Sequence, residues 1–337
     1  MNENENLPTH PIVATSLSQQ IKKKTYYICN TPATNNLHEK RTLIKKADST
    51  NESIFEYAKG QGFLLIKNYE NKMKNFDIST VKLFNYAIWE LTKQNPSGQN
   101  IDQIKTQVEI SIKDYLKKRG FKNNDRAKKQ LIKDLDLLFD SSIDYKETVN
   151  CDRKGKKKIK EIWKTRLICK YKIEPYCDTL TLSVDHDLAK LLINKRRAMA
   201  ISEDYFGMKP IPSEILHKLS TYAETNKWGS NKKEKIENIK KGIRKSFQII
   251  SVKSLLEGVG SIPSYEEVVK SKYHRNVKTK IIAPLIKGLE KLKENRDLLK
   301  WEVCNEKGKP LSEEQEKEKY KWKNFKKLYI KYELIIE

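Results

Sequence analysis

The sequence predicts an α+β protein made of two similar domains in tandem, and three observations carry this prediction. The chain has 337 residues, which is enough for two compact domains. Segments with helix periodicity and segments with strand periodicity follow one another along most of it. Three short fragments also occur twice in the same order, at offsets of 136, 140 and 154 residues.

The periodicity divides the chain into an N-terminal extension and two domains. We expect the extension to cover residues 1–76, the first domain 77–205 and the second 206–337. The extension starts with a polar stretch, residues 1–24, that has no periodicity and is predicted to be partly disordered. Further along the extension, Gly62–Glu70 fits a short strand.

The first domain is predicted to open with three helices. In the first, residues 77–93, the apolar positions form one broad stripe, and Ser79 or Thr80 is the expected N-cap. A short helix follows, with Ser111 as its cap and Gly120 at its end. The third helix, residues 123–141, is capped by Asn124 or Asp125. Strands are expected over 142–147, 162–174 and 178–185, and another helix over 186–197.

The second domain repeats this order. We expect helices over 212–228, 231–246, 250–260, 263–271 and 276–295. A strand and turn follow over 298–309, and after a charged stretch a closing strand covers 326–336.

The repeated fragments align the two domains. The first pairs Lys82–Ala87 with Lys218–Ala223, and the second pairs Ile110–Lys113 with Ile250–Lys253. In the third, the pattern L-I-K-x-L-x-x-L begins at Leu131 and again at Leu285. Three matches in the same order indicate a duplicated domain whose loops differ in length.

Each half therefore predicts helix, helix, longer helix and a basic β-ribbon, which is the order of a winged helix. This is a helix-turn-helix variant whose last helix enters the major groove of DNA. In the first copy the predicted buried stripe is Leu131, Leu135 and Leu138, and the basic face opposite is Arg126, Lys129 and Lys133. In the second copy the buried stripe is Ile281, Leu285, Leu289 and Leu292, and the face opposite is Asn276, Lys280 and Lys287.

Pro284 lies inside the last of these helices and cannot donate a backbone hydrogen bond. Either the helix bends there, or it begins near Ala283 with the proline in its first turn. The second option would leave Asn276 and Lys280 in a loop that could still meet DNA.

The most positive segment of the chain is Asp152–Arg166, with Gly155 at its turn. We predict that it is the wing of the first domain and lies along DNA phosphates, which would make affinity strongly dependent on salt. A solvated loop is the alternative, but so many like charges repel one another. The residues expected to contact DNA here are Arg153, Lys154, Lys156, Lys157 and Lys158.

Charge and composition agree with a nucleic-acid partner. There are 68 Lys and Arg residues against 44 Asp and Glu, which leaves a formal net charge of +24. Such an excess attracts polyanions. The five cysteines form no C-x-x-C pair, and neither a secretory signal nor an apolar run of membrane-spanning length is present. We expect a cytoplasmic protein with no membrane contact.

The sequence predicts no catalytic residue, no cofactor and no metal site. A phosphate-binding G-x-x-x-x-G-K motif is absent, because Asn150 and Val303 stand where its first glycine would be. The histidines are far apart in the sequence. Asp185-His186-Asp187 could be a metal corner, but it fits a helix start, where carboxylates are favoured by the helix dipole.

From Asp77 onward the sequence resembles plasmid replication initiators of the iteron-binding, tandem winged-helix type. The similar segments are "ISVKSLLEGVGSIPSYEEVV", "RNVKTKIIAPLIKGLEKLKE", "LLKWEV" and "FKKLYIKYEL". The resemblance implies two winged-helix domains that read direct repeats of an origin in double-stranded DNA, help to open it and recruit host replication initiator or helicase-loading proteins. It also implies that the protein can form a homodimer.

The resemblance further implies that the second domain carries the stronger base readout. Its expected DNA-binding residues are Arg275, Asn276, Lys278, Thr279, Lys280 and Lys287. Two alternatives stay open at this point. One is a winged-helix transcriptional regulator, and the other is a metal-dependent DNA-nicking or strand-transfer enzyme, if carboxylates converge in space.

Overall fold

The computed structural model divides the chain into two compact units. Unit 1 comprises Met1–Ala33 and Lys45–Glu203, and unit 2 comprises Thr34–Ile44 and Asp204–Glu337. The structure describes residues 25–29, 44–46, 52–57, 62–67, 78–95, 103–150, 157–174, 176–192, 198–229, 232–242, 245, 247–271, 276–295 and 297–334. The predicted disorder of residues 1–24 lies outside these ranges.

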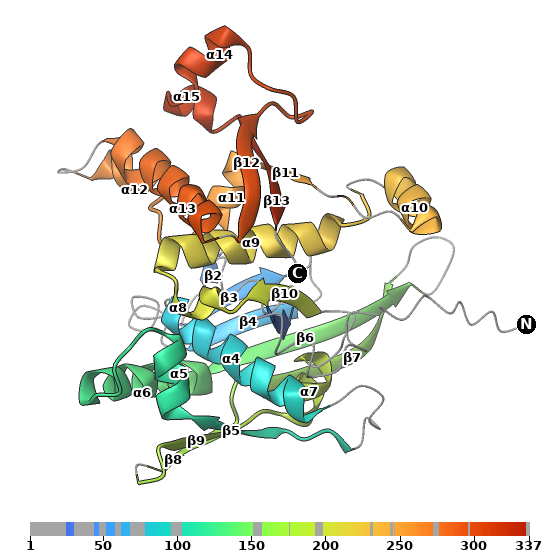
Figure 1. The fold of residues 1–337 in the computed structure, drawn as a ribbon. Helices are drawn as coiled ribbons and strands as arrows, with labels where there is room; N and C mark the ends of the chain where they lie inside the picture. Colours follow the sequence, from blue (N-terminus) through green and yellow to red (C-terminus); the bar gives the residue numbers. More distant parts are fainter. Residues whose placement is uncertain are drawn as a thin grey trace, which may run out of the picture. The chain divides into compact units, whose positions relative to one another are not determined.

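Unit 1 contains a three-helix frame closed by a small antiparallel sheet (Figure 1). The strand order in this sheet is β5-β9-β8, so that the last strand lies between the other two. The elements of the frame are α4 (Ile78–Gln94), β5 (Gln107–Ser111), α5 (Ile112–Lys118), α6 (Asp125–Asp140), β8 (Lys170–Glu174) and β9 (Thr179–Ser183).

The first helix of this frame is buried on nearly all sides. The predicted apolar stripe of α4 is confirmed, and even Lys82 is only 1% exposed. This follows from its position, because α4 packs against β5, α6 and a further strand, β1 (Thr25–Cys29). A helix enclosed in this way shows little polar face.

Two further sheets complete unit 1. A five-stranded sheet has the order β2-β3-β4-β6-β7, and β4 covers the segment in which a strand was predicted. A two-stranded sheet pairs β1 with β10. The remaining elements of the unit are β2 (Ile44–Lys46), β3 (Glu52–Tyr57), β4 (Gly62–Lys67), β6 (Ser141–Asn150), β7 (Lys157–Arg166), α7 (His186–Leu192) and β10 (Ala198–Ser202).

Unit 2 is built on the same plan, with α9 and α13 packed together and a sheet of order β11-β13-β12 (Figure 1). Its helices are α8 (Asp204–Gly207), α9 (Pro210–Asn226), α10 (Lys232–Lys241), α11 (Val252–Glu257), α12 (Tyr265–Lys270), η4 (Lys278–Ile282), α13 (Ala283–Glu294), α14 (Glu313–Glu318) and α15 (Trp322–Phe325). Its strands are β11 (Gln248–Ser251), β12 (Leu298–Cys304) and β13 (Tyr329–Leu334).

The duplication predicted from the sequence is visible in single hydrogen bonds. The backbone N–H of Ile112 donates to the carbonyl oxygen of Asp178 over 2.9 Å, and that of Val252 donates to Leu328 over 2.9 Å. Each bond ties the start of the second frame helix to the residue before the last strand. The repeated fragments occupy α4 and α9, the β5–α5 and β11–α11 junctions, and α6 and α13. The prediction of two tandem winged-helix domains is confirmed.

Candidate nucleic-acid interface

In unit 1 the helix-turn-helix consists of α5, a short turn and α6. Both predicted caps of its two helices are confirmed. The Ser111 hydroxyl accepts the backbone N–H of Asp114 over 3.2 Å, and the Asn124 side chain accepts that of Ala127 over 2.9 Å. Gly120, with φ of 71°, takes the left-handed conformation that ends a helix without a Cβ penalty.

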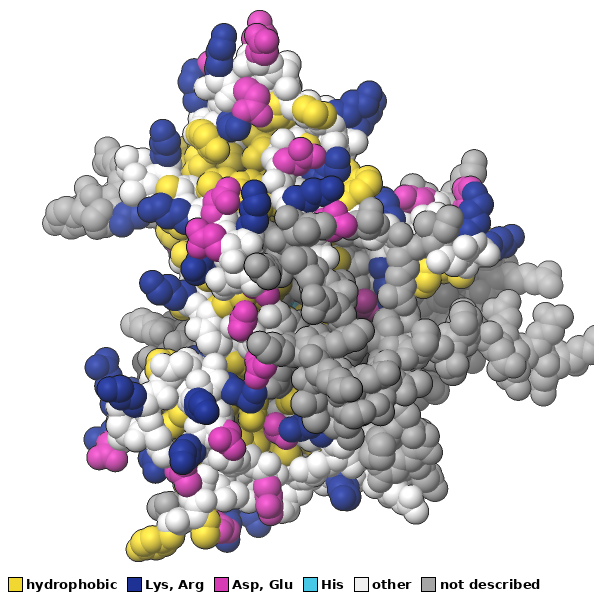
Figure 2. Space-filling model, viewed as in Figure 1, with side chains coloured by type: hydrophobic (Ala, Val, Ile, Leu, Met, Phe, Trp, Pro, Cys, Tyr) yellow, Lys and Arg dark blue, Asp and Glu magenta, His cyan; other side chains and the backbone are white. Residues whose placement is uncertain are grey.

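The second helix of this pair presents the predicted basic face. Leu131, Leu135 and Leu138 are at most 3% exposed, as predicted. Arg126, Lys129 and Lys133 are exposed, and none of the described carboxylates forms an ion pair with them. Figure 2 shows Lys and Arg side chains gathered over α5 and α6. Positive charge without an internal partner is what a phosphate-binding surface requires.

A buried carboxylate fixes α6 against α4. Asp134 is 2% exposed and accepts the hydroxyls of Ser79 over 2.7 Å and Thr80 over 2.9 Å. Arg119 donates to the Ser79 hydroxyl over 3.1 Å and to the Tyr115 hydroxyl over 2.8 Å, which joins α5 to the same network. The prediction of Ser79 or Thr80 as N-cap is wrong, because α4 begins at Ile78 and both hydroxyls donate to Asp134.

The wing of unit 1 is not the basic loop predicted for that role. The strands that close the helix-turn-helix frame are β8 and β9, and the described residues between them, Tyr176–Asp178, form a turn. The described part of the predicted segment, Lys157–Arg166, is strand β7, which pairs with β6 in the five-stranded sheet. The chain changes sheets at the buried residues Leu167 and Ile168.

The residues of the basic loop are described only in part. Arg153, Lys154 and Lys156 lie outside the described residues. Lys157 and Lys158 pair with Asn150 and Val149 in the hairpin, but their side chains are outside the description. Their predicted contact with DNA stays a prediction.

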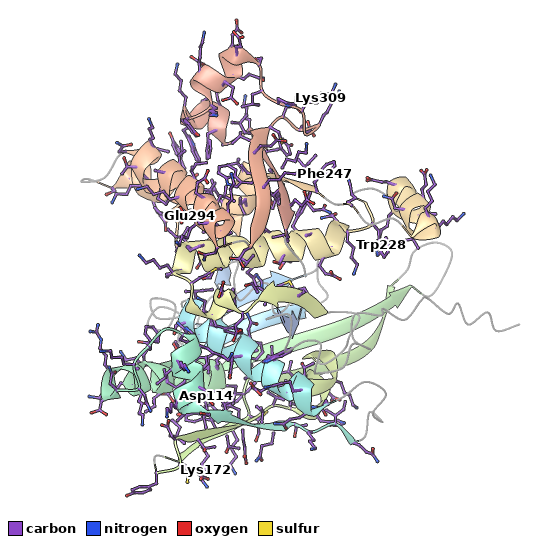
Figure 3. All side chains as sticks on the ribbon, viewed as in Figure 1. Asp114, Lys172, Trp228, Phe247, Glu294 and Lys309 are labelled. Carbon is purple, nitrogen blue, oxygen red and sulfur yellow. The ribbon has the colours of Figure 1, made fainter. Side chains whose placement is uncertain are left out.

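The β8–β9 turn is held next to the start of α6. Asp178 has a positive φ of 53°, and its Oδ2 accepts the Asn123 amide over 3.1 Å. Its Oδ1 lies 3.1 Å from the Lys128 Nζ. Tyr176, two residues earlier, is fully exposed. On β8, Lys172 points outward and pairs with Glu174 (Figure 3). The turn therefore extends the surface of α6.

In unit 2 the recognition helix is continuous from Lys278 to Glu294. Residues 278–282 form one turn of π-helix, and α13 continues with Pro284 in its first turn. The wider turn accommodates a residue without an N–H, so the predicted bend takes the form of a π turn. The Asn276 side chain accepts the backbone N–H of Thr279 over 3.1 Å and starts the helix. Asn276 and Lys280 are therefore not in a loop that is separate from it.

The predicted faces of this helix are also confirmed. Ile281, Leu285, Leu289 and Leu292 are at most 1% exposed. The residues predicted to meet DNA that are described are all at least partly exposed: Asn276, Lys278, Thr279, Lys280 and Lys287. Arg275 lies outside the described residues.

In α6, positive charge prevails in the N-terminal half, and Asp136 and Asp140 follow Lys133 toward the C-terminal end. In α13, Glu290 and Glu294 (Figure 3) follow Lys287, but Lys291 and Lys293 alternate with them and balance their charge. Asp136 accepts the Tyr171 hydroxyl over 2.6 Å, and this hydrogen bond raises the pKa of Tyr171 to about 12. The charge distribution of α6 favours DNA at its N-terminal half, which is the half that contacts bases in helix-turn-helix proteins.

The wing of unit 2 is much longer than that of unit 1. Between β12 and β13 the chain forms α14 and α15. Phe325 is fully buried, and Trp322 stacks on Tyr265 of α12 with ring centroids 5.1 Å apart and planes 3° apart. These contacts attach the insertion to the helix that precedes the recognition helix. The sequence indicated a charged stretch here but not its helices.

The described residues show no arrangement for metal chemistry. No group of three His, Cys, Asp or Glu side chains within them could hold a metal ion. Asp185 is the cap of α7, because its Oδ1 accepts the backbone N–H of Asp187 over 2.9 Å and of Leu188 over 3.3 Å. The prediction of a helix start at this position is confirmed. None of the helices in the described ranges has the length and apolar character that a membrane span needs.

One protein-family model matches a part of the chain that lies within unit 1. Residues 67–202 match the family described as "Initiator Replication protein, WH1". No curated protein sequence matches the chain.

Two solved proteins are among those whose structures were matched to this chain. The Pi initiator protein, crystallised in complex with iteron DNA, shows 11% sequence identity and a TM-score of 0.47, with 94% of this chain and 99% of that chain covered. Domains 2 and 3 of RctB show 13% identity and a TM-score of 0.41, with 91% and 100% covered.

Proposed function

We propose that this chain, whose residues 67–202 carry the WH1 domain of the initiator replication protein family, is a plasmid replication initiator that binds double-stranded DNA in a sequence-specific way. The family match carries the proposal, and it covers the whole helix-turn-helix of unit 1. The same segment presents the exposed basic face of α6. No catalytic group is required of a protein that acts by binding and opening an origin.

The two recognition helices are the expected base-reading elements. Arg126, Lys129 and Lys133 would act in unit 1, and Lys278, Thr279, Lys280 and Lys287 in unit 2. Asn276, at the start of the second helix, and Arg275 would also contact DNA. Two copies of one reader in a chain suit a target made of direct repeats. Recruitment of host replication initiator or helicase-loading proteins, formation of a homodimer and a cytoplasmic location are parts of the same proposal.

Equilibrium binding tests this function. The purified chain would be titrated with a duplex from the region that flanks its own gene and with a random-sequence duplex of equal length. A specific protein binds its site about a thousandfold or more tightly than random DNA at physiological salt. Equal affinity for the two duplexes at every salt concentration would contradict the proposal.

Matched variants locate the contact. We expect Lys133→Ala/Lys287→Ala to weaken binding, since each lysine lies on the exposed face of a recognition helix. Lys235→Ala/Lys240→Ala on α10 removes the same charge from exposed positions in another element. If both pairs weaken binding equally, net charge rather than the recognition helices accounts for the affinity.

A further inference from the structure

The two recognition helices align over their whole length. With an offset of 154 residues, Asp125–Asp140 aligns with Thr279–Glu294. This alignment contains sixteen pairs of residues. Five pairs are identical, namely Leu131 with Leu285, Ile132 with Ile286, Lys133 with Lys287, Leu135 with Leu289 and Leu138 with Leu292. Three further pairs keep the sign of the charge, because Arg126 aligns with Lys280, Asp136 with Glu290 and Asp140 with Glu294, whereas Leu137 and Phe139 align with Lys291 and Lys293.

Packing explains three of these identities but not the other two. The six leucines are buried against the rest of their own units, with exposures of 3% or less. Ile132 is 41% exposed, Ile286 is partly exposed, and Lys133 and Lys287 are exposed. Elsewhere on these helices the copies differ: Lys129 aligns with Ala283.

An exposed isoleucine is common on protein surfaces and needs no explanation when it occurs alone. Here the same isoleucine stands at the same place on both copies, with the same lysine beside it. Ile132 also lies one turn from Lys129, within the exposed face of α6. On a helix that enters the major groove, an apolar side chain at such a position contacts the C5-methyl group of thymine. The neighbouring lysine reaches a guanine edge or a phosphate.

We infer that Ile132 and Ile286 are equivalent specificity residues that contact thymine methyl groups in the major groove, so that the bound DNA contains two related half-sites. This inference rests on the proposed function and names the base feature that its two helices read. It also predicts that the bound sequence contains an internal repeat, because both copies present the same isoleucine–lysine pair.

Replacement of thymine by deoxyuridine tests the contact, because uracil lacks only the methyl group. The probe is a synthetic duplex of the sequence that the full-length chain protects next to its own gene, with its thymines replaced one position at a time. Loss of one buried methyl group lowers affinity about fourfold. We expect such losses at two groups of positions, one in each half of the protected sequence.

Three variants assign the positions. Ile132→Ala should abolish the effect of uracil in one half of the site, and Ile286→Ala should abolish it in the other half. Ile236→Ala removes another exposed isoleucine, on α10, and should leave both groups of positions sensitive. Comparing each variant's own thymine and uracil probes cancels any general loss of affinity.

The outcomes separate this inference from the proposed function. A footprint with no uracil-sensitive position, or sensitivity that persists in both isoleucine variants, overturns the inference and leaves the proposed function standing. A chain that gives no specific footprint overturns both.

Discussion

At the scale of single residues, the two units solve one packing problem in different ways. Where α6 crosses α4, Asp134 is held by two buried hydroxyls, and at the aligned position of α13, Gly288 lies against α9. A Cβ on Gly288 would lie 2.4 Å from Cδ1 of Ile215 and 3.1 Å from Cγ2 of Ile211. Unit 1 therefore fixes its recognition helix by hydrogen bonds, and unit 2 fixes it by close apolar contact.

We expect Gly288→Ala to destabilise the protein. Alanine favours a helix over glycine by about 1 kcal/mol. Overpacking a close contact costs about 1–3 kcal/mol and should exceed that gain. The free energy of unfolding from urea titrations would measure the result. Ile215→Val removes the nearest atom, so the same glycine substitution should cost less in that background. An equal cost in both backgrounds would contradict the packing described here.

Acid sensitivity is the second prediction at this scale. Burial, with a smaller effect of the Lys218 cation, lowers the pKa of His217 to about 3 from its usual 6.5. Below pH 6.5 the histidine of the unfolded chain binds a proton that the folded chain excludes. The free energy of unfolding therefore falls as the pH falls. Between pH 7 and pH 5 the loss amounts to about 2 kcal/mol.

Comparison of the wild type with His217→Leu isolates the part of the pH dependence of stability that comes from His217. Urea unfolding at both pH values should show that the wild type loses about 2 kcal/mol more than the variant on acidification. If the two proteins lose stability in parallel, His217 is not excluded from protonation in the folded state.

At the scale of elements, local signals predicted the helices well. The caps Ser111 and Asn124 and the leucine stripe of α6 depend on residues within one or two turns, and the sequence contains that information directly. The Ser79 or Thr80 cap was wrong because the competing acceptor, Asp134, is more than fifty residues away along the chain. Such competition leaves no local pattern.

The wing was misplaced for a related reason. Strands β7 and β8 are separated by only three residues, and two of these, Leu167 and Ile168, are buried. These apolar residues look like a continuation of the strand, so the sequence marks no boundary where the chain passes from one sheet to the other. Which strands pair is decided by the tertiary structure, and the fully exposed Tyr176 of the true wing lies in a turn that charge alone does not mark.

The predicted contact between the basic loop of residues 152–158 and DNA phosphates can be tested by experiment. If this loop lies on DNA, Lys156→Ala/Lys157→Ala/Lys158→Ala should lower the slope of log affinity against log salt concentration by about 2.7, or 0.9 for each lost phosphate contact. Arginine at the same three positions should keep the slope. An unchanged slope in the alanine variant would show that the loop does not contact phosphates.

At the scale of the whole molecule, duplication explains why one chain contains two units that each have a helix-turn-helix. The order of elements, the strand order of the small sheets and the hydrogen bonds from Ile112 and Val252 are shared by the two units. The additions to this frame differ, with a five-stranded sheet in unit 1 and α10, α12 and, in the wing, α14 and α15 in unit 2. The shared frame thus positions the recognition helices, and the insertions distinguish the units.

The proposed function and the duplication together predict that each unit presents its own recognition helix to one half of a DNA site. Footprinting on DNA that flanks the chain's own gene, carried out with the wild type, Lys133→Ala and Lys287→Ala, tests it most directly. We expect the wild type to protect repeated sites, and each variant to lose protection in a different half of every site. Uniform weakening across the whole site in both variants would contradict the claim.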